Sequence, residues 1–247
     1  MGIFGNLFKK KEVLPPFDLG RFKTDMHSHL IPGIDDGSQS MDQTIAMLAK
    51  FESLGYTKVV TTPHIMSDTF PNNKETIEAG LKEVQKEIKK VGIQIEIEAA
   101  AEYYFDETLM PKIKSKELLT FGDNYVLVEF AFHSSPQYLD QLFFELKTHG
   151  YRPVIAHFER YIYYLGKIDK AEEWRTNGIN IQINLNSLFG QYGPDIKKQA
   201  EKLIDAGQFD FVGTDCHRIE HLMFLEDHLS SPYLHKIGKY LVKNMVL

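Results

Sequence analysis

Cysteine is nearly absent from this chain. Among its 247 residues only Cys216 is a cysteine, so no disulfide can form within the chain. Lysine and arginine form no long run and the formal net charge is -6, which disfavours nucleic-acid binding as the main role. No apolar stretch approaches the roughly 18 consecutive residues of a membrane-spanning helix. These absences favour a protein of the reducing cytoplasm.

The first residues lack the signals of secretion and acylation. They read MGIFGNLFKKK, with apolar residues before the lysines, which is the reverse of a signal peptide. Asn6 stands where the myristoylation pattern requires Ser or Thr. We expect residues 1–21 to form an N-terminal extension that begins as a mobile tail ending at Pro15 and Pro16. The alternative is a weak peripheral membrane contact by the apolar residues and the three lysines that follow them.

Apolar runs and helical patterns alternate from Phe22 onward. Hydrophobic residues make up 43% of the chain, enough for a substantial core. The β-type runs are at residues 22–29, 57–64, 93–103, 125–132, 152–158, 179–186 and 209–217. Helical spacing is found at residues 41–54, 74–91, 107–118, 137–149, 167–176 and 194–206, and a last helix is expected over 232–246.

This alternation predicts an α/β fold with a parallel sheet. Residues 126–128 and 154–156 are apolar without alternation, as buried parallel strands are. An open doubly wound sheet and a closed barrel both fit the order of elements. No glycine-rich phosphate loop follows the first strand, which argues against a dinucleotide-binding fold. The length suits one barrel domain over residues 22–247.

Side chains that can bind metal stand at the carboxyl ends of the predicted strands. They are His27 and His29, His64, Glu102, Glu129, His157, and Asp215 with His217, joined by Asp35 and Asp36 in the loop after the first strand. Active sites of barrels are built at that end of the sheet. Each residue alone has an ordinary explanation, such as a hydrogen-bonded histidine in the core. Their shared position predicts a metal site.

The types of these residues indicate which chemistry the site supports. Glu129 interrupts the apolar run VLVEFAF, and a buried carboxylate is costly unless it is paired or bound to metal. Imidazole and carboxylate ligands without thiolate favour Mn, Fe or Zn. A multinuclear centre of this kind attracts phosphoryl groups and activates water. The residues therefore predict a metal-dependent phosphoesterase.

Short motifs along the chain carry a resemblance to a known superfamily. DMHSH, TTPH, the glutamates of AAEYY and VEF, IAHFERY and GTDCH occur in the order of the PHP (polymerase and histidinol phosphatase) superfamily. With IPGIDDG added, the chain resembles the bacterial CpsB/YwqE-type protein-tyrosine phosphatases from about Lys23 to His217. The resemblance implies a distorted (β/α)7 barrel, three divalent metal ions, most often Mn²⁺, and hydrolysis of phosphotyrosine in proteins. The implied substrate is a bacterial tyrosine kinase that regulates capsule or exopolysaccharide production.

The resemblance also implies a role for individual residues. The three ions would be held by His27, His29, Glu102 and Asp215, by Glu102, Glu129 and His157, and by Asp36, His64 and His217. Asp35 is the alternative to Asp36. Arg160 and Arg218 would hold the phosphate, unless they are ordinary solvated or ion-paired arginines. Candidate walls for an aromatic leaving group, or else core residues, are Tyr103, Tyr104, Phe132 and His133.

Three other functions compete with this hypothesis. A PHP phosphatase acting on a small molecule such as histidinol phosphate and an amidohydrolase acting on amides or lactones share the H-x-H opening. A metal-dependent binding scaffold is disfavoured because no expected ligand position is missing. Cysteine-based catalysis is excluded by the C-x5-R rule, because Leu222 occupies the arginine position counted from Cys216. We expect the Cys216 thiol to point away from the ligands.

Overall fold

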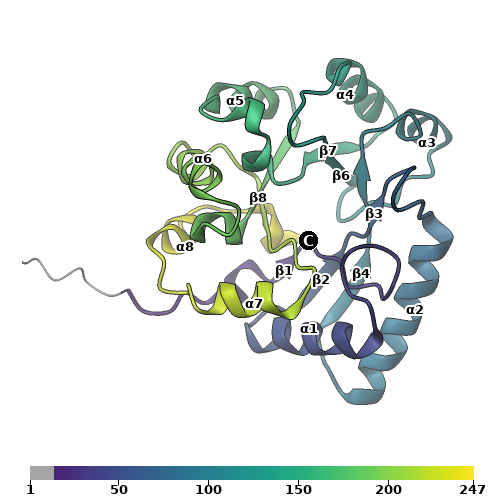
Figure 1. Ribbon diagram of the computed structural model, residues 1–247, viewed down its shortest axis with the longest axis vertical. Helices are drawn as coiled ribbons and strands as arrows, with labels where there is room; N and C mark the ends of the chain where they lie inside the picture. The colour runs from purple at the N-terminus through teal and green to yellow at the C-terminus, as the bar shows by residue number, and fades with distance from the viewer. Residues whose placement is uncertain (1–13) are drawn as a thin grey trace, which may run out of the picture.

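The computed structural model describes residues 14–247 as a curled parallel sheet with helices around it (Figure 1). One sheet has the order β1 (Thr24–Asp25), β2 (Lys58–Thr61) and β4 (Glu96–Ala99). The other has the order β3 (His64–Ile65), β5 (Glu102–Tyr104), β6 (Tyr125–Glu129), β7 (Arg152–Ile155), β8 (Asn180–Asn184) and β9 (Phe211–Gly213). Each pairing between these strands is parallel. The predicted α/β class and parallel sheet are confirmed.

The two sheets are consecutive parts of one curved wall. After β2 the chain passes through Thr62 and Pro63 into β3, and β4 leads into β5 in the same way. The predicted second and third strands are therefore each divided into two elements. First and last strands meet where Ser28 forms an isolated parallel bridge with Cys216, and the His29 amide donates to the Cys216 carbonyl at 2.8 Å. The count of seven β/α units stays a prediction.

The helices lie on the outside of this wall (Figure 1). They are α1 (Met41–Ser53), α2 (Lys74–Val91), α3 (Leu109–Ser115), α4 (Leu139–Thr148), α5 (Ile168–Thr176), α6 (Pro194–Asp205), α7 (Ile219–Glu226) and α8 (Pro232–Ile237). Side-chain caps start three of them: Ser40 accepts from the Gln43 amide before α1, Asn73 forms a capping box with Thr76 before α2, and Ser231 accepts from the Tyr233 amide before α8. The six helices predicted between the strands are present; α2 has the predicted bounds and the other five have shifted ends. The α7 helix was not predicted.

The predicted last helix over residues 232–246 is wrong in extent. The α8 helix ends at Ile237, and only Lys243–Val246 resumes as a short 3-10 turn. The Asn244 side chain accepts from the Val212 amide at 3.0 Å and donates to the Thr24 carbonyl at 3.0 Å. These bonds satisfy backbone groups of the first and last strands, so the chain turns under the barrel instead of extending the helix.

Apolar side chains fill both faces of the wall, which explains the unbroken apolar runs. Inside lies a cluster that includes Met26, Val60, Leu127, Val154 and Phe211. Outside, the neighbouring strand residues, such as Val126 and Ile155, pack in the larger cluster beneath the helices. Burial on two faces is the expected environment of parallel strands.

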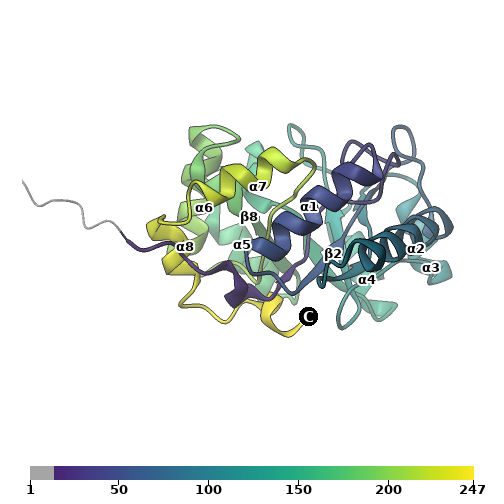
Figure 2. The same cartoon turned by 90° about the horizontal axis from the view of Figure 1, so that it is seen from below.

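The segment from residue 14 to β1 runs beside α8 (Figure 2). The Phe17 amide donates to the Leu229 carbonyl at 2.9 Å, and the Phe17 side chain is buried. Arg21 donates to the Gly238 carbonyl at 2.9 Å. The described part of the predicted extension thus packs against the barrel, including the end of the predicted tail, where the Pro15 carbonyl lies 2.9 Å from His235 Nε2. The rest of the predicted tail and the membrane contact lie in residues 1–13, outside the described residues. From Leu14 onward, the structure contains no helix that is long and apolar enough to cross a membrane.

Candidate metal centre

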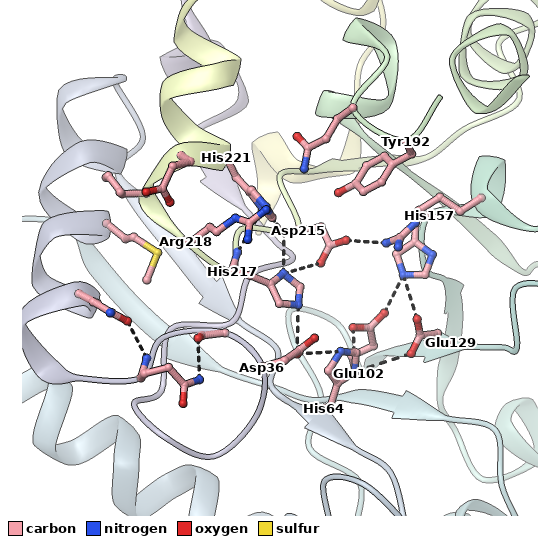
Figure 3. A pocket seen from close by; sticks show the side chains of 18 of the residues that line it. Asp36, His64, Glu102, Glu129, His157, Tyr192, Asp215, His217, Arg218 and His221 are labelled. Carbon is pink, nitrogen blue, oxygen red and sulfur yellow. Dashed lines mark hydrogen bonds and ion pairs between the residues drawn. The ribbon is translucent and has the colours of Figure 1, made fainter. Parts of the chain in front are cut away.

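A cavity of about 780 Å³ opens at the carboxyl ends of the strands (Figure 3). Two of the predicted ligands, His27 and His29, alternate across one residue after β1, which puts both side chains on the same face. The Nε2 atom of His27 lies 3.1 Å from Glu102 Oε2 and 3.4 Å from Asp215 Oδ1. The Nε2 atom of His29 lies 3.4 Å from Glu102 Oε2 and 3.5 Å from Asp215 Oδ1. These four buried residues form one group whose ligand atoms are mutually within 4.8 Å.

Glu102 also belongs to a second group. His157 Nε2 lies 3.0 Å from Glu102 Oε1 and 3.5 Å from Glu129 Oε1. On the other side of the two carboxylates, His64 Nδ1 lies 3.3 Å from Glu102 Oε2 and 3.7 Å from Glu129 Oε2. The carboxylate of Glu102 is therefore shared, with Oε2 toward the histidines of the first strand and Oε1 toward His157.

The third group distinguishes the two adjacent aspartates. Asp36 Oδ1 lies 3.6 Å from His64 Nε2 and 3.3 Å from His217 Nε2, on the cavity side. Asp35 instead lies 2.8 Å from His29 Nδ1 and accepts from the Gly37 amide at 2.9 Å. A Cβ at Gly37 would stand 2.3 Å from the Cβ of His29, so this tight turn requires glycine. Asp36 therefore has the geometry of a ligand, and Asp35 that of a residue that orients His29.

Two orienting residues on β8 escaped the sequence analysis. Gln182 Oε1 lies 3.1 Å from His27 Nδ1 and accepts from the His157 amide at 2.7 Å. Its Nε2 donates to Asn184 Oδ1 at 2.8 Å, and Asn184 donates to Asp215 Oδ2 at 2.8 Å. A partner on the far nitrogen fixes the ring so that Nε2 faces the carboxylates. The signal that could have found them is the alternation of polar residues in NIQIN, within a wall of apolar strands.

The two glutamates of the site have pKa shifts in opposite directions. Burial and the neighbouring Glu102 raise the pKa of Glu129 well above its usual value. Burial also acts to raise the pKa of Glu102, but the neighbouring His27 and His64 outweigh it and hold this pKa well below the ordinary range. Burial and Arg160 lower the pKa of His157 to about 4, so its imidazole is neutral, as a ligand must be.

One further atom fits a bound cation. His64 Nδ1 is buried and has no hydrogen-bond partner among the described residues, although it faces two carboxylates. An unsatisfied buried nitrogen is costly, and coordination to a metal ion would satisfy it. Imidazole and carboxylate donors at these spacings match divalent Mn, Fe or Zn. The residues present therefore fit a metal cluster.

Two proposed ligands have a left-handed backbone. His157 has φ 31° and Asp215 has φ 51°, both rare for residues other than glycine. Such conformations cost about 1–3 kcal/mol each and persist where surrounding contacts impose them. At Asp215 the amide donates to the His27 carbonyl at 2.8 Å, which imposes this bend at the end of the last strand.

The two predicted arginines have different environments. Arg160 Nη1 donates to Asp215 Oδ2 at 2.9 Å, and its Cζ lies 4.4 Å from the ring centroids of both Phe132 and Tyr192. Arg218 is exposed at the start of α7 and lines the same cavity (Figure 3). Both therefore reach the site, but only Arg160 is held there by an ion pair and two aromatic rings.

Of the four predicted aromatic walls, Phe132 lines the cavity. Tyr103 is buried in the core, where its hydroxyl accepts from the Leu119 amide at 2.7 Å. Tyr104 is partly buried beside Glu129, and His133 is exposed. The aromatic residue that the sequence analysis missed is Tyr192.

Cys216 is buried among apolar side chains. Its Sγ lies 3.6 Å from Met47 Sδ, and burial raises the pKa of the thiol well above its usual value. The thiol is therefore protonated and part of the core, as the alternation along the strand predicts. A protonated, buried thiol is a poor nucleophile.

Similar proteins are known. The family described as "Capsular polysaccharide synthesis, CpsB/CapC" matches residues 23–244. The putative tyrosine-protein phosphatase CapC of Staphylococcus aureus is 32% identical over 225 residues, which cover 88% of each chain. The tyrosine-protein phosphatase CpsB of Streptococcus pneumoniae is 29% identical, over 79% of this chain and 83% of its own.

A solved structure matches over nearly the whole chain. It is described as YwqE from Bacillus subtilis and CpsB from Streptococcus pneumoniae, metal-dependent tyrosine phosphatases. Its TM-score is 0.75 at 26% identity, over 90% of this chain and 94% of that structure.

Proposed function

This chain belongs to the CpsB/CapC family, and we propose that it is a metal-dependent protein-tyrosine phosphatase, the activity named for its relatives. The observation that carries the proposal is the shared carboxylate of Glu102. It joins two groups of possible ligands, and Arg160 lies beside them with a hydrogen bond to Asp215. A multinuclear metal centre next to a guanidinium is an arrangement suited to phosphoryl groups.

We propose three divalent metal ions and assign them to Mn²⁺, because the set is rich in carboxylate and has no thiolate, with Fe or Zn as alternatives. The proposed ligand sets are His27, His29, Glu102 and Asp215; Glu102, Glu129 and His157; and Asp36, His64 and His217. His64 could serve two of these sets, because its Nε2 faces Asp36 and its Nδ1 faces Glu102 and Glu129. The choice of Asp36 over Asp35 is supported by its position in the cavity. Gln182, Asn184 and Asp35 would orient the ligands rather than bind metal.

The side chains around this centre have separate tasks. When bound, the ions would supply Lewis-acid stabilisation and lower the pKa of a water that attacks phosphorus. Arg160 would bind phosphoryl oxygens with the N–H groups that its bond to Asp215 leaves over, since a guanidinium carries five donors. Arg218, which is exposed at the start of α7 and lines the same cavity, would be a second contact. Phe132 would contact the aromatic leaving group.

The biological setting is also proposed. The substrate would be a bacterial tyrosine kinase that controls capsule or exopolysaccharide production, in keeping with the description of the family. The single cysteine suits a cytoplasmic protein. The catalytic domain would begin near residue 22, with the segment from residue 14 packed on its outside.

The test is a comparison of three substrates on protein loaded with Mn²⁺. Phosphate release is measured from a phosphotyrosyl peptide and from histidinol phosphate, and ring opening from a simple lactone. The proposal predicts that the peptide has the highest kcat/KM. Preference for histidinol phosphate would support a small-molecule phosphatase, and activity confined to the lactone would support an amidohydrolase.

A further inference from the structure

We propose that Tyr192 is a positioning residue for Arg160, and that Tyr192 and Phe132 together form an aromatic sandwich that holds the guanidinium at the phosphoryl-binding position. This inference rests on the proposed function, because it assigns Arg160 to the phosphoryl group. Tyr192 belongs to no strand or helix and stands outside every predicted ligand motif.

The geometry around Arg160 defines the sandwich. Its Cζ lies 4.4 Å from the ring centroid of Phe132 and 4.4 Å from that of Tyr192, so both rings make close cation–π contacts. Nη1 donates to Asp215 Oδ2 at 2.9 Å. In Figure 3 the ring of Tyr192 reaches into the cavity on the side of Asp215 and His157. The rings and the aspartate together fix the plane of the guanidinium and one of its edges.

The loop that carries Tyr192 is built to keep its shape. Gly190 (φ 87°) and Gly193 (φ 98°) flank it with left-handed backbone that other residues rarely adopt. The Gly193 amide donates to the Gly190 carbonyl at 3.0 Å, and Pro194 starts α6 directly afterwards. The position of the Tyr192 ring is therefore set by the backbone on both sides of it.

A buried carboxylate ties this loop to the turn that carries Arg160. Glu159, the residue before Arg160, accepts from Ser187 Oγ at 2.7 Å and from the Asn184 amide at 2.9 Å. Ser187 lies in the 3-10 turn Leu185–Phe189, which leads into the Tyr192 loop. The turn that carries Arg160 and the loop that carries Tyr192 are thus connected through the fully buried side chain of Glu159.

Aromatic faces position a cation without neutralising it. A second carboxylate in place of Tyr192 would also hold Arg160, but it would compete with the phosphate for the guanidinium. Burial raises the pKa of Tyr192, so the hydroxyl stays neutral and adds no negative charge. Removal of one ring should therefore cost about tenfold in phosphate affinity, an effect of the size expected for one partly desolvated cation–π contact.

A double-mutant cycle on the Mn²⁺-loaded protein tests the assignment. The variants are Tyr192→Leu, Tyr192→Phe, Arg160→Ala and the double variant Tyr192→Leu/Arg160→Ala. The measurements are kcat/KM on a phosphotyrosyl peptide and the dissociation constant of inorganic phosphate. We expect Tyr192→Leu to lose about tenfold in both and Tyr192→Phe to recover most of that loss. In the Arg160→Ala background, Tyr192→Leu should have little further effect.

An equal loss from Tyr192→Leu with and without Arg160 would overturn the inference, because Tyr192 would then act independently of the guanidinium. A fall in bound metal or in melting temperature that accounts for the loss would overturn it as well. Tyr233→Leu, on α8 and outside the cavity lining, is the matched control for the loss of a tyrosine ring.

Phosphate binding separates this inference from the proposed function. If the wild-type protein does not hydrolyse phosphotyrosine, the proposed function fails. The cycle can then still be completed with the dissociation constants for inorganic phosphate. Wild-type protein that binds no phosphate would overturn the inference too.

Discussion

The two ends of the barrel both contain clusters of charged side chains, but the charges are balanced differently. At the amino ends of the strands, Asp210 lies 2.9 Å from Arg175 Nε and 3.5 Å from Lys243 Nζ, and accepts from the Ile181 amide at 3.1 Å. At the carboxyl ends, Glu102 and Glu129 face neighbouring histidines, one of which, His64, has a buried nitrogen without a partner in the described structure.

The contrast separates a structural site from a functional one. At the amino end each charge already has a protein partner of opposite sign, so the cluster is complete without a ligand. At the carboxyl end, burial and the neighbouring Glu102 raise the pKa of Glu129 well above its usual value, so the protein alone does not stabilise the charge of this carboxylate. Perturbed groups of this kind mark functional sites, and here a bound cation would complete them.

The largest expected effect is at the shared carboxylate. Glu102→Gln keeps the shape of the side chain but removes the charge that two groups of ligands share. We expect kcat/KM to fall by at least roughly 100-fold and bound metal to fall with it. Metal analysis and kinetics on the same sample measure this. A Glu102→Gln variant that keeps both its metal and its activity would contradict the assignment of the carboxyl end as the functional metal site.

A smaller loss, without loss of metal, is expected at Arg160. Charge-assisted hydrogen bonds contribute about 1.5–3 kcal/mol, so Arg160→Ala should lower kcat/KM by roughly 10- to 100-fold. Arg160→Lys should recover only part, because the charge returns without the planar fork. Kinetics, metal stoichiometry and melting temperature are compared for the three proteins. Wild-type kinetics in Arg160→Ala would exclude it from the site.

The opposite pattern is expected at the amino end. Asp210→Asn leaves Arg175 and Lys243 without their carboxylate partner, and we expect the free energy of unfolding to fall by about 1–3 kcal/mol. Activity per folded molecule should stay at the wild-type level. Denaturant titration and kinetics on the same preparation check both. Loss of activity without loss of stability would show that this end also serves catalysis.

The smallest effect is expected at Cys216. Its thiol is buried beside Met47 and protonated, and a serine hydroxyl there can donate to the Arg218 carbonyl that now lies 3.4 Å from Sγ. Cys216→Ser should therefore retain most of the activity, with a stability loss of roughly 1 kcal/mol. Mass spectrometry of trapped intermediates is the direct check. A covalent phosphocysteine would contradict the prediction.

The sequence predicted which end of the sheet holds the site, although not the exact bounds of the strands, because two signals coincide there. An apolar run that ends in a polar metal-binding residue, as at Glu129, marks both a buried strand and a side chain at its carboxyl end. Parallel strands then bring those ends together, so the sequence predicted which residues the structure gathers around one cavity. The division of two strands at Pro63 and near Ala100 has no such signal.

What the sequence did not predict depends on contacts between distant segments. Gln182 and Asn184 look like ordinary polar strand residues until β8 is placed beside His27 and Asp215. Tyr192 lies in a loop whose direction is set by α6 and by the turn at Glu159. Whether Asp35 or Asp36 faces the cavity depends on the conformation of the loop that carries them, which the sequence does not reveal. The α7 helix was missed because it is only eight residues long, with Met223 exposed between buried leucines.

The central claim is that activity requires metal ions at the carboxyl end of the barrel. The most direct measurement is phosphatase activity on a phosphotyrosyl peptide, with metal content determined on the same sample before chelation, after chelation and after addition of Mn²⁺, Fe²⁺ or Zn²⁺. We predict that chelation abolishes activity and that Mn²⁺ restores it best, in proportion to the metal bound. Full activity in a verified metal-free sample would contradict the account.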